Sequence, residues 1–161
     1  MLLCAIDADS KKNGWAIYDG FRLAFCGLAS RSEYPEFVDM FKVDLTIVEL
    51  PQVYQRRKSK GNPNDLVAIT ASGAELAGRI GAPVEYYRPR TWKGNLDKTL
   101  VHQRTRAHFE HTEDFNSLYV WDAIEYRFGS EQASEVCDAA SFGLWWARKC
   151  QVRRPSPDTL R

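Results

Sequence analysis

Short apolar runs separated by turn residues fill the first thirty positions of the chain. Residues 2–8 form an almost continuous apolar run, residues 14–18 (GWAIY) form a second, and residues 21–28 form a third. The segments 11–14 (KKNG) and 19–20 (DG) lie between these runs, and an Asp-Gly pair flanked by apolar residues is a strong hairpin signal. This pattern predicts three strands joined by tight turns, which is an antiparallel meander.

Helix and strand patterns alternate in the rest of the chain. Residues 63–80 predict a helix, because Asn62-Pro63 is a typical helix start, apolar residues recur at helical spacing, and Gly81 follows. The other predicted elements are a helix over 34–42, strands over 44–50 and 82–87, and helices over 98–109, 118–127 and 130–149.

This order of elements predicts an α/β fold. Parallel strands are expected to extend the antiparallel meander into a mixed five-stranded sheet with helices on both faces. We expect one domain over residues 1–150 and a loose C-terminal tail over residues 151–161. Within the helix over 63–80, the small residues Val67, Ala71, Ala74 and Gly78 form a stripe that either contacts a second copy of the chain or packs on its own sheet.

Composition narrows the class of protein. The chain has 161 residues, is 44% hydrophobic, and carries a net charge of +1 from 22 basic and 21 acidic residues. This excludes a uniformly basic protein, although an uneven distribution of charge still permits nucleic-acid binding.

None of the four cysteines forms a CxxC pair, so we expect reduced thiols. No apolar run approaches the roughly 20 residues of a membrane span, and no secretory signal is visible. We expect a soluble, cytoplasmic protein.

Carboxylates interrupt three of the apolar elements. Asp7 ends the first strand and Glu49 ends the fourth, so both emerge at one sheet edge if these strands are adjacent and parallel. Glu135 and Asp138 lie three residues apart on the last helix and point the same way. A single acidic residue at a strand end is more often a solvated terminus. Four carboxylates that converge would repel one another unless a cation lay between them. Carboxylate oxygens are ligands that suit Mg²⁺ or Mn²⁺.

Four segments together resemble a known family. AIDADSKKNGWAI, TIVELPQVY, RPRTWKGNLDKTLV and EVCDAASFGLWWA occur in the order and spacing of the RuvC-type Holliday junction resolvases, in the RNase H-like nuclease superfamily. The resemblance covers roughly residues 2–148. It implies an RNase H-like fold, two Mg²⁺ ions held by Asp7, Glu49, Glu135 and Asp138, and a lysine, Lys98, near the scissile phosphate.

The chain departs from the family pattern at two positions. The family usually has Asp where this chain has Glu135, which keeps the charge but reaches further. Asp9 adds a carboxylate after the first strand, where it either binds metal or serves as a turn residue.

His102 lies four residues after Lys98 on the same helix, and its role stays open between assisting the site and ordinary packing.

Basic residues gather in two segments that follow predicted strand ends. Tyr54 with Arg56, Arg57, Lys58 and Lys60 follows Glu49, and Arg90 with Lys93 follows the fifth strand. We predict that these residues bind DNA, with the cations holding phosphates and Tyr54 stacking on an exposed base. The alternative is a solvated basic loop.

The tryptophans are expected to have different roles. Trp92 is predicted as a buried anchor of its loop. Of Trp145 and Trp146, one is expected to pack on the sheet and the other to cover the surface or meet a partner.

The resemblance implies a function. It implies a crossover junction endodeoxyribonuclease that cleaves four-way and related branched DNA, leaving 3′-hydroxyl and 5′-phosphate ends. Mn²⁺ is expected to replace Mg²⁺. A homodimer is expected, because a four-way junction needs two cuts at related positions. The small single-domain form suggests a phage-type or divergent member. Two alternatives stay open: another RNase H-like nuclease that acts on RNA–DNA hybrids or nicked duplexes, and a junction-binding protein without activity.

Overall fold

The computed structural model describes residues 1–30, 37–51 and 63–149. Three strands open the chain: β1 (Leu2–Asp7), β2 (Lys12–Asp19) and β3 (Arg22–Ser30). β2 pairs antiparallel with both β1 and β3, and the turn into β3 contains Gly20 at φ 62°. That backbone conformation favours glycine. The predicted meander is confirmed, with strand ends that differ from the prediction by one or two residues.

Two further strands complete the sheet. β4 (Leu45–Glu49) lies parallel to β1, and β5 (Val84–Tyr87) lies parallel to β4, which gives the order β3-β2-β1-β4-β5. The predicted α/β class and mixed five-stranded sheet are confirmed. β1 is flanked on both sides, and its residues from Leu3 onward are buried. A strand covered on both faces is apolar throughout, which explains the continuous run in the sequence.

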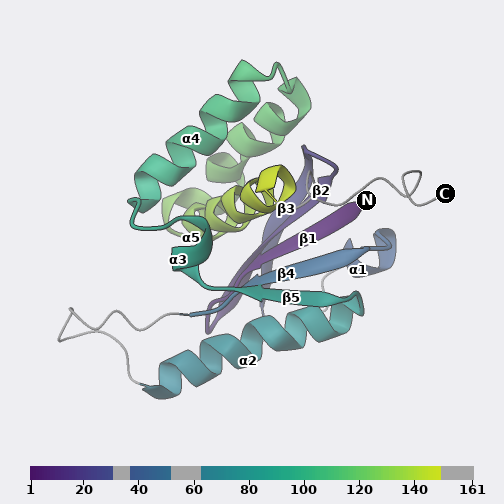
Figure 1. Ribbon diagram of the computed structural model, residues 1–161, viewed down its shortest axis with the longest axis vertical. Coiled ribbons are helices and arrows are strands. Elements are labelled where there is room, and N and C mark those ends of the chain that lie inside the picture. The colour runs from purple at the N-terminus through teal and green to yellow at the C-terminus, as the bar shows by residue number, and fades with distance from the viewer. Residues whose placement is uncertain (31–36, 52–62, 150–161) are drawn as a thin grey trace.

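Helices cover both faces of this sheet, as predicted (Figure 1). α2 (Pro63–Ile80) lies on one face, and α5 (Phe115–Lys149) lies on the other. α4 (Lys98–His111) packs on α5 rather than on the sheet. Two short helices also occur: α1 (Phe37–Met40), where a helix over 34–42 was expected, and α3 (Pro89–Trp92), which the sequence pattern did not indicate.

The C-terminal helices differ from the prediction. Residues 110–117 were expected as a polar connection between separate helices, but α4 continues to His111 and α5 already begins at Phe115. Asp114 explains the early start, because its side chain accepts a hydrogen bond from the Ser117 N–H at 3.1 Å and so caps the helix. The predicted break at Gly129 is present as a kink with φ 70° and ψ 166° inside α5.

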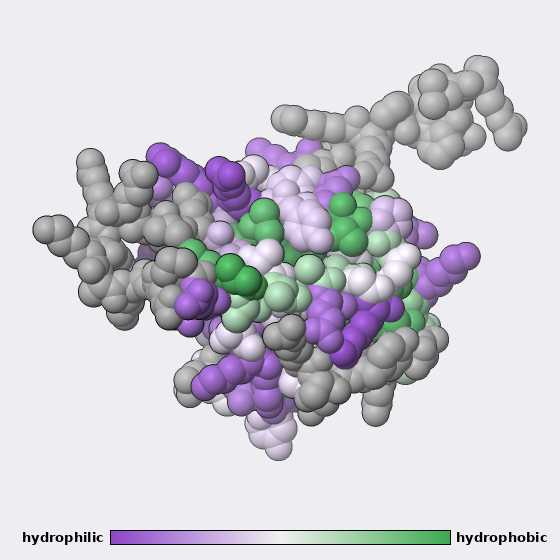
Figure 2. Space-filling model, turned by 90° about the horizontal axis from the view of Figure 1, so that it is seen from below, coloured by the Kyte–Doolittle hydropathy of each residue, from purple (hydrophilic) through white to green (hydrophobic). Residues whose placement is uncertain are grey.

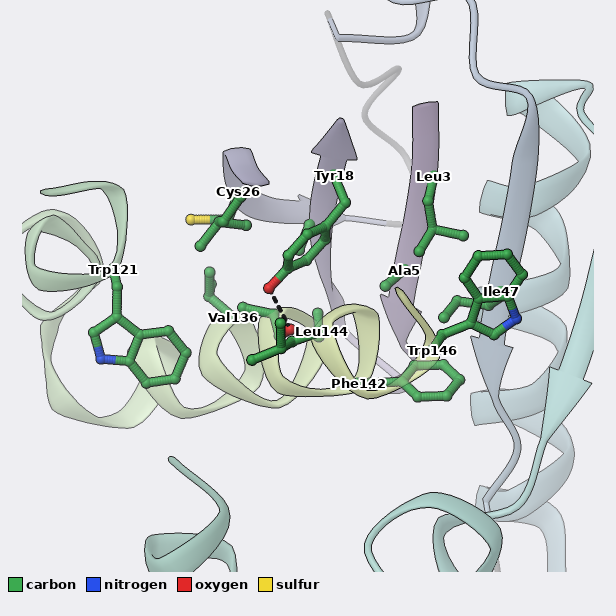
Figure 3. Close-up of a cluster of buried hydrophobic side chains, with 14 of the residues drawn as sticks. Leu3, Ala5, Tyr18, Cys26, Ile47, Trp121, Val136, Phe142, Leu144 and Trp146 are labelled. Atoms are coloured by element: carbon green, nitrogen blue, oxygen red, sulfur yellow. Dashed lines mark hydrogen bonds between the residues drawn. The ribbon is translucent and has the colours of Figure 1, made fainter. Parts of the chain in front are cut away.

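The larger core lies between the sheet and α5 (Figure 3). Tyr18 points from β2 toward α5, and its hydroxyl donates a hydrogen bond to the Ala140 carbonyl at 2.7 Å. Gly143 permits this approach, since a Cβ there would lie 2.5 Å from a ring carbon of Tyr18. Trp146 is fully buried in the same core. These contacts fix how far α5 lies from β1 and β2.

The two faces of α2 differ in their surroundings. Leu76 and Ala77 are buried against the sheet, and Gly73 approaches Ala8 so closely that a Cβ would lie 2.8 Å from the alanine methyl. The predicted small-residue stripe lies elsewhere on the helix: Val67 is 68% exposed, and a Cβ added to Gly78 would meet nothing within 4 Å. The two ends of this stripe therefore do not pack on the sheet, and Ala71 and Ala74 between them are half-buried.

The surface on the side of α2 is mixed in character. Figure 2, which views the molecule from this side, shows pale green and white residues between strongly hydrophilic ones. Across the described ranges, no helix combines the length and the apolar character that crossing a membrane requires.

Candidate metal centre

The carboxyl ends of two central strands bring the first pair of acidic residues together. β1 and β4 are parallel, and Asp7 and Glu49 are register partners at their last positions. Both side chains are buried, with 8% of each residue exposed. The expectation that these strands are adjacent and parallel is confirmed, and it places both carboxylates at one sheet edge.

α5 brings the second pair of carboxylates to this edge. Glu135 and Asp138 lie one turn apart on the helix, and Asp138 is 5% exposed. The helix can come this close because β2 has a glycine opposite it: a Cβ on Gly14 would lie 2.1 Å from the Glu135 carbonyl oxygen. A larger residue at position 14 would push α5 away from the end of β1.

Three of the four predicted ligands have carboxylate oxygens close enough to share one cation. Asp7, Glu135 and Asp138 each offer an oxygen, and these atoms all lie within 4.8 Å of one another. Glu49 stands beside this group but is turned toward other partners. Its Oε2 accepts a hydrogen bond from Trp92 Nε1 at 2.5 Å, and its Oε1 lies 3.3 Å from Lys93 Nζ.

Two side chains of α4 contact these carboxylates, and one of them, Lys98, is a cation. Lys98 Nζ lies 2.6 Å from Asp138 Oδ2 and 3.5 Å from Glu135 Oε1. His102 Nε2 lies 2.7 Å from Asp138 Oδ1. α4 begins at Lys98, because Asp97 caps it by accepting a hydrogen bond from the Thr99 N–H at 2.9 Å. The cap therefore places Lys98 and, one turn later, His102 over the acidic residues.

The pKa values of three of these carboxyl groups shift in different directions. Burial and then the charges of Asp138, Glu49 and Glu135 raise the pKa of Asp7 well above its usual range. Burial also raises the pKa of Glu49, against the opposing effects of Lys93 and Trp92. For Asp138, burial acts upward, but the hydrogen bond with His102 and the charge of Lys98 outweigh it, so the pKa is lowered.

These pKa directions fit a cation-binding site. A buried carboxylate without a compensating charge is costly, and Asp7 has no cation of its own among the described residues. A divalent ion would supply that charge, and the donor atoms are all carboxylate oxygens, which hard ions such as Mg²⁺ and Mn²⁺ prefer. The residues present therefore fit a divalent metal.

Solved structures of Holliday junction resolvases are similar to this chain in fold. The chain aligns with Thermus thermophilus RuvC in complex with a Holliday junction substrate at a TM-score of 0.54 and 18% identity, over 94% of this chain and 96% of that one. It also aligns with the yeast mitochondrial Holliday junction resolvase Ydc2 at a TM-score of 0.58 and 9% identity. This alignment covers 91% of this chain and 78% of that one.

A viral structure matches as well. The fowlpox virus resolvase with junction DNA aligns at a TM-score of 0.51 and 16% identity, over 96% of this chain and 100% of that one. The chain has the fold of the RuvC-type resolvases. At the level of sequence alone, no family model and no curated protein matches it.

Within this resolvase fold, the remaining predicted site residues lie as follows. Lys93 is half-buried against Glu49, so its charge is already engaged there. Arg90 is exposed on α3. The other predicted DNA-binding residues lie outside the described residues; they are Tyr54, Arg56, Arg57, Lys58 and Lys60.

Asp9 has the geometry of a turn residue. Its Oδ1 accepts a hydrogen bond from the Lys11 N–H at 2.8 Å, which stabilises the turn between β1 and β2. Of the two interpretations of Asp9, the geometry therefore favours the turn. This is the usual local behaviour of an aspartate at such a position.

Sequence reasoning identified Trp92 only as a buried anchor of its loop. The residue is indeed buried, with 8% exposed, but it also holds Glu49 through its indole nitrogen. The role of His102 was left open, and the structure shows that His102 contacts Asp138. No local sequence motif predicts either contact, because each joins residues more than 30 positions apart.

Proposed function

We propose that the protein is a metal-dependent endonuclease that cleaves Holliday junctions and related branched DNA. One observation carries the proposal: carboxylates of β1, β4 and α5 meet at one edge of a sheet, with Lys98 on top of them. The fold supports it, because the chain aligns over more than nine-tenths of its length with resolvases, two of them solved with junction DNA.

Asp7, Glu135 and Asp138 would hold divalent metal, with Glu49 beside them as the fourth ligand. Bound Mg²⁺ or Mn²⁺ would lower the pKa of the attacking water and stabilise the leaving oxygen of the phosphodiester. Hydrolysis in this way would leave a 5′-phosphate and a 3′-hydroxyl.

The protein's own groups would orient the site and balance its charge. Trp92 and Lys93 fix both oxygens of Glu49, and His102 fixes one oxygen of Asp138. Such partners of metal-binding carboxylates commonly affect metal affinity or activity by about 10- to 100-fold. Lys98 would neutralise negative charge that develops on the phosphate.

The DNA surface and the dimer complete the proposal. Arg90 on α3 would contact the DNA backbone, together with the basic residues after Glu49. Two copies of the chain, one for each cut, would meet through the outward stripe of α2 that contains Val67 and Gly78.

Cleavage of a labelled four-way junction by the wild-type protein and by Asp7→Asn, side by side in Mg²⁺, tests the proposal. We expect the wild type to nick junction arms, and the variant to bind equally well or better without cutting, because it loses a ligand and a negative charge. A panel with a flap, a nicked duplex and an RNA–DNA hybrid tests the choice of substrate. Preference for the hybrid would point to another RNase H-like nuclease, and binding without cutting in both Mg²⁺ and Mn²⁺ would point to an inactive junction-binding protein.

A further inference from the structure

A hollow separate from the acidic residues lies between α4 and the last turns of α5. α3 and the residues that follow it close one end. Its volume is ≈ 300 Å³, and ligand pockets begin at about this size. The hollow can therefore accept a group as large as one nucleobase or nucleotide.

The charge around this hollow has one sign. Lys93, Arg104, Arg148 and Lys149 line it, and none of the described residues that line it is acidic. Arg104 and Arg148 are exposed. Within the part of the chain that the structure describes, neither arginine forms an ion pair with a carboxylate. Two such arginines favour an anionic ligand, and the planar guanidinium group is well suited to phosphate.

An aromatic side chain lines the same hollow. Trp145 is half-buried, and its ring stacks on Phe142 at 6.1 Å with an interplanar angle of 18°. Tyr87 contacts the Trp145 ring edge-on at 5.4 Å. The neighbouring Trp146 is fully buried in the core beside the sheet, so the expectation that one of the two packs on the sheet is confirmed. An indole held by two aromatic neighbours is a rigid surface on which a base can stack.

The hollow lies next to the acidic residues, although none of them lines it. Trp92 and Lys93 line it and also contact Glu49. Deeper inside, Thr105 donates a hydrogen bond to Ser141 at 2.9 Å. Thr105 and Ser141 each lie three residues beyond a member of the His102–Asp138 pair, which is about one helical turn, or ~5 Å, along α4 and α5. A DNA strand that passes the acidic residues would reach the hollow with a neighbouring nucleotide.

We propose that this hollow, lined by Trp145, Arg104 and Arg148, binds one unstacked nucleotide of the DNA strand next to the bond that is cut. The base lies against Trp145, and the phosphate lies between the two arginines. A branched DNA offers such a nucleotide at low cost, because its bases at the branch point are already partly unstacked. The hollow would thus contribute to the preference for branched over linear DNA. This inference rests on the proposed function.

Binding of a fluorescein-labelled four-way junction to the full chain tests the proposal. Anisotropy is measured with Ca²⁺ in place of Mg²⁺, so that binding is separated from cutting. We expect Trp145→Ala to bind roughly tenfold more weakly, as for the loss of one base–aromatic stack. Arg104→Ala and Arg148→Ala are expected to weaken binding by a similar factor. Arg127→Ala, which removes an exposed cation from the part of α5 before the kink at Gly129, is the matched control.

Junctions with a single abasic site identify the nucleotide. One abasic position next to the cut should weaken binding by the wild type about tenfold, and Trp145→Ala should lose nothing further on that DNA. Equal losses at every abasic position would overturn the proposal. Arg104→Ala leaves the aromatic packing intact, so it keeps the test decisive if Trp145→Ala does not fold.

Failure of this inference can be told apart from failure of the proposed function. If the wild type neither binds nor cuts the junction, the proposed function is wrong. If the wild type binds and cuts, but Arg104→Ala, Arg148→Ala and Trp145→Ala all behave like Arg127→Ala, only the nucleotide pocket is wrong.

Discussion

The indole N–H of Trp92 donates a hydrogen bond to Glu49 Oε2 at 2.5 Å, and Lys93 holds the other oxygen of the same carboxylate at 3.3 Å. These two contacts turn the Glu49 carboxylate to one side of Asp7, Glu135 and Asp138, whose oxygens lie within 4.8 Å of one another. Consecutive residues of one short segment thus fix both oxygens of a predicted metal ligand.

Loss of the Trp92 hydrogen bond should therefore reduce cleavage. Trp92→Phe keeps an aromatic ring in place but removes one of the two contacts that fix Glu49, and we expect about 10-fold slower junction cleavage with a higher Mg²⁺ requirement. Cleavage rates over a Mg²⁺ titration provide the measurement. Trp146→Phe is the control for removing a buried indole, because Trp146 is fully buried and its Nε1 donates a hydrogen bond to Glu85 rather than to a site residue. Equal effects of the two substitutions would argue against an orienting role.

Asp7→Asn should stabilise the protein when no metal is present. The pKa of Asp7 is raised in the folded state, so the folded chain holds this proton more tightly than the unfolded chain does. The free energy of unfolding therefore falls as pH rises above the ordinary aspartate pKa of 3.8. Asparagine does not ionise, so the variant does not lose this stability as the pH rises. A gain of about 1 kcal/mol in the free energy of unfolding would raise Tm by ~2–4 °C in a chain of this size.

Thermal unfolding at pH 7 in EDTA and in Mn²⁺ checks this prediction. The wild type should gain stability on adding Mn²⁺, because the ion binds the folded state, whereas Asp7→Asn should gain little. A variant that is less stable than the wild type in EDTA would show that Asp7 is not a strained, uncompensated carboxylate.

Gly14 should be intolerant of a side chain. A Cβ there would lie 2.1 Å from the Glu135 carbonyl oxygen, so Gly14→Ala must displace α5. We expect a loss of about 1–3 kcal/mol in the free energy of unfolding, which is typical of overpacking, together with weaker metal binding. Denaturant unfolding and Mn²⁺ titration measure the two effects. Gly78→Ala is the control, since a Cβ there meets nothing within 4 Å.

His108 should make stability fall at mildly acidic pH. Burial and then the charge of Arg148 lower its pKa from the ordinary value of 6.5, despite the opposing charge of Asp114. As pH falls below that value, the unfolded chain takes up a proton before the folded chain does, so the free energy of unfolding decreases. His108→Gln should flatten the dependence of Tm on pH between about 7 and 5. Parallel curves for the two proteins would contradict this assignment.

The outward stripe of α2 should govern association. Ala74→Arg places a charge in the middle of this stripe and should convert a dimer into a monomer, while single cuts of a nicked substrate continue. Light scattering after gel filtration gives the mass in solution. Met40→Arg introduces the same side chain at a position that is 65% exposed on α1, and should leave the mass unchanged. Retention of the dimer by Ala74→Arg would place the interface elsewhere.

Local sequence was sufficient to predict most of the elements. The apolar run before Asp7, the Asp-Gly turn and the proline-started helix depend on interactions between near neighbours, and these determine strands, turns and helix ends. Asp114 was the exception in the C-terminal half, because a single capping side chain moved the start of α5 into a stretch that looks like a polar connection.

The sequence by itself determined which acidic residues interrupt apolar elements, but it left the parallel pairing of β1 with β4 as a condition, which the structure meets. Only the tertiary structure decided which oxygens meet. Packing of α5 against Gly14 and Tyr18 brings Asp138 and Glu135 to Asp7, while Trp92 and Lys93 turn Glu49 aside. Those contacts join residues far apart in the chain, and their distances depend on side-chain packing that no local pattern encodes.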